Sequence, residues 1–341
     1  MGKRIYLAAN NPDLGGGEQM LLRHAEALLD LGHPVTVVAP DSPGEVLDAA
    51  AAGGADVVPI RARGRRDYMR RLHAWDKTER RGLLWCHGLV AALATAGHRR
   101  RIVHLHQLPR SRAQHAALLA ARAGSDRLLV PSVFLSRRLR GSGVCANWTD
   151  DAPRQSVRFP AGRVGFLGRL STIKGVDLLA QAITSPSIDP RVQLLVAGDD
   201  RWVPKSEGAP VRAALDGLGE RVHRLGRVAP ETFFNQVDLA VFPSRIPESF
   251  GLVVAEAMAS GVPFVISDAG ALPEAAGPDH PWVARAGDPE DLARVIGHAL
   301  ATSPEDVRAV TDAARIRWES EYSPAAGRDR VARLLADLEV L

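Results

Sequence analysis

Residues 239–267 read LAVFPSRIPESFGLVVAEAMASGVPFVIS. Residues 239–242 and 263–267 are short apolar runs, which predict two buried strands. Between them, Phe250-Gly251-Leu252 opens a segment of helix-forming residues that runs through Met258. A strand, a helix and a second strand in this order are typical of a parallel sheet, because parallel strands need a long crossover that is usually helical.

The same alternation extends along the whole chain and predicts an α/β fold, with parallel sheets covered by helices on both faces. The other predicted strands are residues 4–9, 35–39, 83–86, 102–105, 128–130, 163–167, 193–197 and 222–225, with a helix over 18–31. The polar, proline-containing segment 150–156 predicts a linker, and therefore domains over 1–155 and 156–322. The tail that follows is predicted to be helical and to break at Ser323-Pro324.

The composition fits a globular protein with two compact domains, since 46% of the 341 residues are hydrophobic. No stretch approaches the ~20 apolar residues of a membrane span. The N-terminus predicts a first strand rather than a secretory signal. The two cysteines, Cys86 and Cys145, provide neither a disulfide framework nor a set of metal ligands. We therefore expect a reduced, cytoplasmic protein.

Positive charge is concentrated in the first half of the chain. Residues 1–155 contain 23 Lys and Arg and 14 Asp and Glu (+9), the remainder contains 20 and 25 (−5), and the two sum to the net charge of +4. The density is highest over residues 61–81, which include Arg65 and Arg66. One interpretation is an anionic acceptor, or an anionic membrane surface that carries the acceptor. The other is an ordinary solvated surface. Nucleic acid is not expected, because no aromatic platform accompanies the charge.

Two segments, one of them the segment quoted first, carry charges that together could hold a sugar nucleotide. The segment Gly168-Arg-Leu-Ser-Thr-Ile-Lys174-Gly175 has two cations, Arg169 and Lys174, that suit a diphosphate. In the segment quoted first, the amides of Gly251 and Leu252 open a helix, whose N-terminus favours anions. Glu248 precedes this helix and Glu256 lies within it. Their carboxylates would repel phosphate but could accept hydrogen bonds from sugar hydroxyls.

A third segment, Gly15-Gly16-Gly17-Glu18, follows the first predicted strand and opens a helix. Backbone amides of such a loop can approach a phosphate. The glycines do not have the spacing of the dinucleotide-binding fingerprint, which argues against a nicotinamide dehydrogenase.

Three histidines lie at predicted strand ends, namely His87, His104 and His106. A zinc site is not expected there, because His104 and His106 alternate across the sheet if the strand continues and no third ligand follows at metal spacing.

The Glu-x7-Glu element, the Gly-Arg-Leu-x3-Lys-Gly element and the early glycine loop resemble the retaining nucleotide-sugar glycosyltransferases of family 4. This resemblance implies the GT-B fold, with two Rossmann-like domains facing across a cleft and the last helix, 323–341, crossing back onto the N-terminal domain. It identifies Asp199-Asp200 as a structural turn rather than a metal site. Over residues 147–151, Asn-Trp-Thr-Asp-Asp differs from the family's usual Asn-Gly-x-Asp, and the chain is shorter than many members.

The resemblance also implies roles for individual residues. The catalytic candidates are His106, Arg169, Lys174 and Glu248. His104 is the second choice to His106, and His87 matches a less essential element. The donor-binding candidates are Gly16, Gly17, Gly168, Arg227, Val228, Phe250, Gly251, Leu252 and Glu256. The acceptor candidates are Gly15, Gly16, Arg65 and Arg66.

The implied activity is sugar transfer to an acceptor hydroxyl by a metal-independent front-face mechanism, in which the leaving diphosphate accepts the acceptor's proton. No cofactor is expected; a UDP-sugar is the first choice of donor and a GDP-sugar the second. Two alternatives remain, a nucleotide-sugar epimerase on the same fold and a catalytically idle nucleotide- or carbohydrate-binding protein. The expected partners are a small-molecule donor and acceptor. We expect a monomer or homodimer, cytoplasmic or peripheral at the inner membrane face.

Overall fold

The computed structural model describes residues 2–159, 161–201 and 203–338 and divides the chain into two compact units. Unit 1 comprises Met1–Asn147 and Pro324–Leu341, and unit 2 comprises Trp148–Ser323. The first boundary therefore lies before the predicted linker rather than within it. The reason is that this segment bonds to unit 2: the Thr149 amide donates to the Tyr322 carbonyl (3.0 Å), and the Gln155 amide donates to that of Ser260 (2.8 Å).

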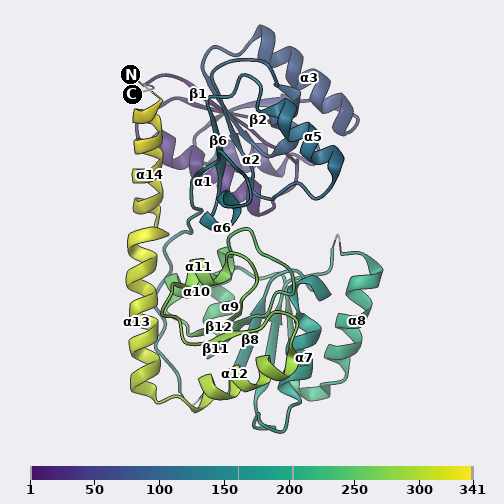
Figure 1. Cartoon of the computed structure of the whole chain (residues 1–341), viewed down its shortest axis with the longest axis vertical. Coiled ribbons are helices and arrows are strands. Elements are labelled where there is room, and N and C mark those ends of the chain that lie inside the picture. Colours follow the sequence, from purple (N-terminus) through teal and green to yellow (C-terminus); the bar gives the residue numbers. More distant parts are fainter. Residues whose placement is uncertain (1, 160, 202, 339–341) are drawn as a thin grey trace. The chain divides into compact units, whose positions relative to one another are not determined.

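Unit 1 is built on a seven-stranded parallel sheet with the order β3-β2-β1-β4-β5-β6-β7. Strands β1, β2 and β6 of this sheet are labelled in Figure 1. Its strands are β1 Ile5–Ala8, β2 Val35–Pro40, β3 Asp56–Ile60, β4 Leu83–His87, β5 Arg101–His104, β6 Arg127–Val130 and β7 Gly143–Val144. Its helices are α1 Gly16–Asp30, α2 Glu45–Ala52, α3 Arg65–Thr78, α4 Leu89–Ala94, α5 Arg112–Ala121, α6 Val133–Ser136 and α14 Pro324–Asp337.

Unit 2 contains a six-stranded parallel sheet with the order β10-β9-β8-β11-β12-β13. Its strands are β8 Arg163–Leu167, β9 Gln193–Ala197, β10 Val222–Gly226, β11 Leu239–Phe242, β12 Phe264–Ser267 and β13 Val283–Ala284. Its helices are α7 Val176–Ile183, α8 Lys205–Asp216, α9 Pro230–Phe234, α10 Leu252–Ser260, α11 Leu272–Ala276, α12 Pro289–Ala301 and α13 Pro304–Glu321, with 3-10 turns η1 Thr172–Lys174 and η2 Gly219–Arg221.

The predicted α/β class with two parallel sheets is confirmed, and β8, β9 and β11 have the predicted bounds. Three strands were not predicted, and all three lie at sheet edges: β3, β7 and β13. The reason differs between them. In β3, the sequence Asp-Val-Val-Pro-Ile is largely exposed and contains Pro59, which weakens the strand signal. The strands β7 and β13 have only two residues each, too few for a periodic pattern.

The last helix, α14, belongs to unit 1 and packs against α1. Leu335 is fully buried on this helix, and Arg328 forms an ion pair with Asp30 of α1 at 2.8 Å. Residues 339–341 of the predicted helix lie outside the described residues. Among the helices of the described chain, none combines the length and apolar character needed to cross a membrane.

The strand order determines where a ligand would bind in each unit. In a doubly wound sheet, ligands bind beyond the carboxyl ends of the strands, at the point where the strand order reverses. In unit 1 this point lies between β1 and β4, and in unit 2 between β8 and β11. Strands β1, β8 and β11 are each followed by a segment that carries predicted site residues, and β4 ends at His87.

Candidate active site

In unit 2, the loops that follow β8 and β11 bring Lys174 and Glu248 together. Lys174 Nζ donates a hydrogen bond to Glu248 Oε1 at 2.5 Å, and Ser244 Oγ donates to the same oxygen at 2.5 Å. Both charged side chains remain partly accessible, with 24% of the Lys174 side chain and 18% of the Glu248 side chain exposed. The two segments that the sequence analysis paired therefore meet in one cluster at the β8/β11 reversal point.

Arg245 holds the two loops in this arrangement. Its guanidinium donates to Asp177 Oδ2 at 2.7 Å and to the Thr172 carbonyl at 3.2 Å, and its amide donates to the Ile173 carbonyl at 2.9 Å. Two of these bonds reach the turn that carries Lys174 and the third reaches α7, so the segment before Glu248 is attached to both. The sequence assigned no chemistry to Arg245, and we classify it as a positioning residue.

The electrostatic setting of Glu248 keeps it ionised. Burial alone raises the pKa of Glu248, but Lys174, Ser244 and the nearby charge of Arg169 lower it by more, so its pKa lies below the usual value. At neutral pH the carboxylate can accept hydrogen bonds and cannot act as a proton donor.

Arg169, in contrast, is exposed and available to a ligand. It lies two residues beyond the end of β8, and its charge acts on Glu248. Within residues 2–159, 161–201 and 203–338, no side chain forms an ion pair or hydrogen bond with its guanidinium. An anion could therefore bind Arg169 without breaking an existing contact.

The helix predicted after Phe250 is α10, and it begins at Leu252 with Gly251 at the capping position. Gly251 has φ +100°, and a Cβ there would lie 2.6 Å from a Leu272 methyl group, so glycine is required. The first amides of a helix have no acceptor within it, which suits an anion. Glu256 lies partly exposed on the same helix.

Phe250 corrects the prediction in one respect. Its ring is 5% exposed and packs edge-on against Tyr322, with the ring centroids 5.2 Å apart. The side chain is therefore part of the core of unit 2, and only its backbone is left for a donor.

The remaining predicted donor residues of unit 2 lie on neighbouring strand ends. Gly168 follows β8, and a Cβ on Gly198 would lie 1.9 Å from the Gly168 carbonyl oxygen, so the two turns touch through their backbones. Arg227 is exposed and Val228 is partly buried just beyond β10. Asp199 and Asp200 bond to nearby groups, the Arg201 amide and the Arg212 guanidinium, which agrees with a turn.

We expect Gly175→Ala to destabilise unit 2 by about 2–3 kcal/mol. Gly175 has φ +73°, and an added Cβ would lie 2.0 Å from the Pro243 carbonyl oxygen, so backbone strain and a clash between the two loops would combine. Gly219→Ala is the matched control, because it has φ +55° with no atom within 4 Å of the added carbon and should cost about 1 kcal/mol. Urea unfolding of both variants measures the difference, and equal losses would contradict the proposed close approach of the loops.

In unit 1, the glycine loop follows β1 and opens α1, as predicted. Gly15 caps the helix, and Glu18 is buried in its first turn, where Oε1 accepts from the Asn11 amide (3.2 Å) and side chain (3.0 Å). A Cβ on Gly17 would lie 3.2 Å from the ring of His106. Gly17 and His106, which are far apart in sequence, are therefore neighbours at the β1/β4 reversal point.

The three strand-end histidines differ in exposure. His106 is partly exposed, whereas His87 and His104 are 1% and 0% exposed. His87 Nδ1 and His106 Nε2 share a hydrogen bond at 3.1 Å. Burial lowers the pKa of His106 to about 4, so the ring is neutral at physiological pH. Only His106 of the three is exposed enough to contact a substrate, and His87 orients it.

The spacing along the chain predicts no third metal ligand for His104 and His106. In the structure, candidate third ligands do lie beside them. His87 joins them, and His24 and Cys145 form a second group with His104. The missing ligands come from other elements of unit 1, which spacing cannot reveal.

The predicted acceptor residues Arg65 and Arg66 are exposed at the start of α3. Elsewhere in the basic segment, Arg70 and Arg71 form ion pairs with Asp67 at 2.6 and 3.2 Å. In the part of the chain that the structure describes, no carboxylate pairs with Arg65 or Arg66. The positive charge of this segment is thus partly neutralised, but not at Arg65 and Arg66.

Comparison with known families gives two matches, one in each half of the chain. The model for Glycosyltransferase Family 4 matches residues 14–149, and that for Glycosyl transferases group 1 matches residues 161–302. The chain belongs to glycosyltransferase family 4. Both family 4 matches include the segments described above, the glycine loop in the first and the Lys174–Glu248 cluster in the second.

Curated relatives cover parts of this family 4 chain. A D-inositol 3-phosphate glycosyltransferase of Streptomyces griseus is 31% identical over 51% of this chain and 38% of its own length. An MMP alpha-(1->4)-mannosyltransferase of Mycolicibacterium hassiacum is 33% identical over 44% of this chain and 37% of its own length. Both matches therefore span less than half of the curated relative.

Solved structures show the fold over almost the whole chain. HepE of Anabaena, in a complex with UDP-glucose, has a TM-score of 0.82 at 19% identity and covers 98% of this chain and 99% of its own. Sucrose-phosphate synthase from Thermosynechococcus elongatus has a TM-score of 0.80 at 19% identity, with the same coverage. The predicted GT-B fold is confirmed.

Proposed function

We propose that this protein transfers a sugar from a nucleoside diphosphate sugar to an acceptor hydroxyl, with retention of the anomeric configuration. The observation that carries the proposal is the Lys174–Glu248–Ser244 cluster at the β8/β11 reversal point, with Arg169 exposed beside it. Family 4 membership supports the same reaction class.

The donor's diphosphate binds Arg169, Lys174 and the first amides of α10. Cations and helix amides are the groups that stabilise negative charge as it develops on a leaving phosphate. Lys174 can serve the diphosphate while bonded to Glu248, because an ammonium group has three donors. Glu256 accepts hydrogen bonds from the ribose, and Arg227 and Val228 lie along the nucleobase.

Glu248 and His106 contact the sugar. The lowered pKa of Glu248 keeps it a hydrogen-bond acceptor, and its bond to Lys174 leaves it poorly suited to a covalent role. The reaction therefore follows the front-face route, in which the leaving diphosphate accepts the proton of the acceptor hydroxyl. No metal is needed for this step, since Arg169 and Lys174 supply the positive charge.

The acceptor is anionic and small, of the phosphorylated-polyol type. Arg65 and Arg66 support this choice, because both are exposed and lack carboxylate partners among the described residues. Several relatives are named D-inositol 3-phosphate glycosyltransferase, and D-inositol 3-phosphate is a phosphorylated polyol. The cytoplasmic location, the contact with a membrane surface and the oligomeric state stay predictions.

The nucleotide is tested first, by thermal unfolding with UDP, GDP and ADP in excess and no added metal. We expect UDP to stabilise most, since HepE binds UDP-glucose. A ligand at 100 times its dissociation constant adds ~2.7 kcal/mol to the free energy of unfolding. Glu256→Ala should weaken the shift with every nucleotide, because it removes the ribose contact. Absence of any shift would contradict the donor site.

Product analysis then separates the proposal from its alternatives. Transfer releases a nucleoside diphosphate together with a new glycoside, whereas an epimerase converts one sugar nucleotide into another. Nucleotide binding without either product, over a broad panel of acceptors, would instead indicate an idle binding protein.

A further inference from the structure

Five side chains with metal-binding atoms gather inside unit 1, beside the glycine loop. They form two groups that share one residue, His24 with His104 and Cys145, and His87 with His104 and His106. In each group, the candidate ligand atoms all lie within 4.8 Å of one another. The proposed sugar transfer uses only His106 and its neighbour His87, so the first group has no role in it.

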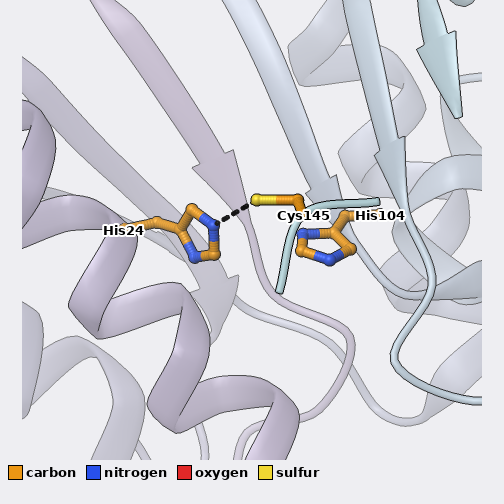
Figure 2. A group of neighbouring side chains, drawn as sticks. All are labelled: His24, His104 and Cys145. Atoms are coloured by element: carbon orange, nitrogen blue, oxygen red, sulfur yellow. Dashed lines mark hydrogen bonds between the residues drawn. The ribbon is translucent and has the colours of Figure 1, made fainter. Parts of the chain in front are cut away.

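The first group draws its members from three parts of unit 1 (Figure 2). His24 lies on α1, His104 ends β5 and Cys145 follows β7. All three are buried, with exposed fractions of 0%, 0% and 2%. Segments that are distant in sequence thus present an imidazole, a second imidazole and a thiol to one small volume.

The ring of His24 is already oriented as a metal ligand would be. Its Nδ1–H donates to the Met20 carbonyl at 2.5 Å, which leaves the Nε2 lone pair directed at Cys145 Sγ, 3.7 Å away. A backbone carbonyl on the far nitrogen is the usual partner of a metal-binding histidine. With Zn–S about 2.3 Å and Zn–N about 2.0–2.1 Å, tetrahedral ligands lie about 3.6 Å apart. The Cys145 thiol donates a hydrogen bond to His24 Nε2 at this spacing, which also matches that of two ligands with a zinc ion between them.

His104 provides the second, independent observation. Both of its ring nitrogens are buried, and neither has a hydrogen-bond partner among the described residues. A buried polar group without a partner costs about 1–3 kcal/mol, so such groups are rare in folded proteins. One nitrogen of His104 lies within ligand range of His24 and Cys145, and coordination would satisfy it.

The first group suits a cation better than the second, because Cys145 can supply a negative charge that offsets the cost of placing a divalent ion in a buried site. In each group a metal would replace one hydrogen bond, that of Cys145 with His24 at 3.7 Å or that of His87 with His106 at 3.1 Å.

We infer that His24, His104 and Cys145 form a binding site for a thiophilic metal ion of the zinc type. Binding forms one Zn–S and two Zn–N bonds and releases the thiol proton of Cys145 to solvent, because the thiolate is the ligand. The metal ties α1 to the carboxyl end of β5 and to the segment after β7, and its role is to stabilise unit 1.

The test begins with the purified full-length chain, kept reduced and stripped with a chelator. Zn²⁺ is added back and the bound metal is counted, and Co²⁺ is added separately as a spectroscopic probe. We expect one equivalent of Zn²⁺, a Co²⁺ spectrum with a thiolate-to-metal charge-transfer band, and a higher unfolding midpoint with Zn²⁺ than with chelator.

Cys145→Ser should abolish the charge-transfer band and the rise in the unfolding midpoint. It should also weaken zinc binding by more than the roughly 10–100-fold typical of losing an outer-shell partner. Cys86→Ser is the matched control, because Cys86 is equally buried but bonds to Thr95 Oγ1 at 3.5 Å and belongs to neither group. It should bind Zn²⁺ like the unmodified chain.

A measurement without variants guards against misfolding. Zn²⁺ should slow the modification of Cys145 by a thiol reagent, read by peptide mass spectrometry, and leave that of Cys86 unchanged. The inference is overturned if the chain binds no Zn²⁺, if Cys145→Ser retains it unchanged, or if Zn²⁺ protects both cysteines equally.

Discussion

Replacing Arg169 with alanine is expected to lower turnover by about 2–4 kcal/mol of transition-state stabilisation, roughly 30- to 1000-fold. The unfolding midpoint should hardly change. Arg169 is exposed, and among the described side chains none pairs with it, so its loss leaves no buried charge uncompensated. The whole effect should appear in catalysis, because the guanidinium stabilises charge that develops only as the diphosphate leaves.

Lys174→Ala would be a less direct test of the same charge. Lys174 bonds to the partly buried Glu248, and removing it would leave that carboxylate without its main partner. Lost turnover could then reflect a disturbed loop. Arg169→Ala removes a positive charge without removing a hydrogen bond or ion pair to another described side chain, so it tests the electrostatic role without disturbing the loop.

The measurement is release of nucleoside diphosphate with the donor and acceptor found by screening. Arg163→Ala is the matched control, because Arg163 is an exposed arginine at the opposite end of the same strand, β8. It should retain nearly full turnover. Turnover of Arg169→Ala close to that of this control would show that the diphosphate does not bind Arg169.

A second large effect is expected in mild acid, where unit 1 should lose several kcal/mol of unfolding free energy between pH 6.5 and pH 5. His24, His87 and His104 are buried in its core. Burial lowers the pKa of His24 to about 3 and holds the pKa of His87 and of His104 well below the usual value. The hydrogen bond from His24 to the Met20 carbonyl raises the pKa of His24, but by less than burial lowers it. The neighbouring histidines also disfavour protonation of one another.

The direction follows from proton linkage. Below an unfolded-state pKa of about 6.5, the unfolded chain binds protons that the native core excludes, so stability falls as pH falls. A histidine that stays neutral in the native state removes up to about 1.7 kcal/mol between pH 6.5 and pH 5, because the unfolded ring is only half protonated at pH 6.5. Carboxylates with lowered pKa values, such as Asp67 and Asp291, lose their contribution only at lower pH. The range from pH 6.5 to 5 therefore isolates the histidines.

Urea unfolding at several pH values, with a chelator present to exclude metal, measures this loss. His104→Leu should reduce the loss, because it removes one of the four rings of unit 1 with lowered pKa values, His24, His87, His104 and His106. His115→Gln is the matched control, since its ring is exposed on α5 and the loss should stay complete. A pH-independent free energy of unfolding over this range would contradict a core of neutral histidines.

Local patterns were enough to predict most of the fold. Short apolar runs identified the central strands of both sheets, because a strand buried on both faces is apolar throughout. The edge strands β3, β7 and β13 lack that pattern, since one of their sides faces solvent or the strand has only two residues. The linker was predicted from polarity and a proline, yet backbone bonds from Thr149 and Gln155 attach it to unit 2.

By itself, the sequence determined the α/β class, the two-part organisation and the segments that carry the charged candidates, because these depend on residues close together in the chain. Only the tertiary structure decided which of them meet. Lys174 and Glu248 form one cluster through Arg245, Phe250 faces the core, and His106 rather than His104 is accessible. The association of His24, His104 and Cys145 likewise depends on the crossover order of the sheet. Parallel strands bring together residues separated by whole helices, and spacing along the chain does not record that proximity.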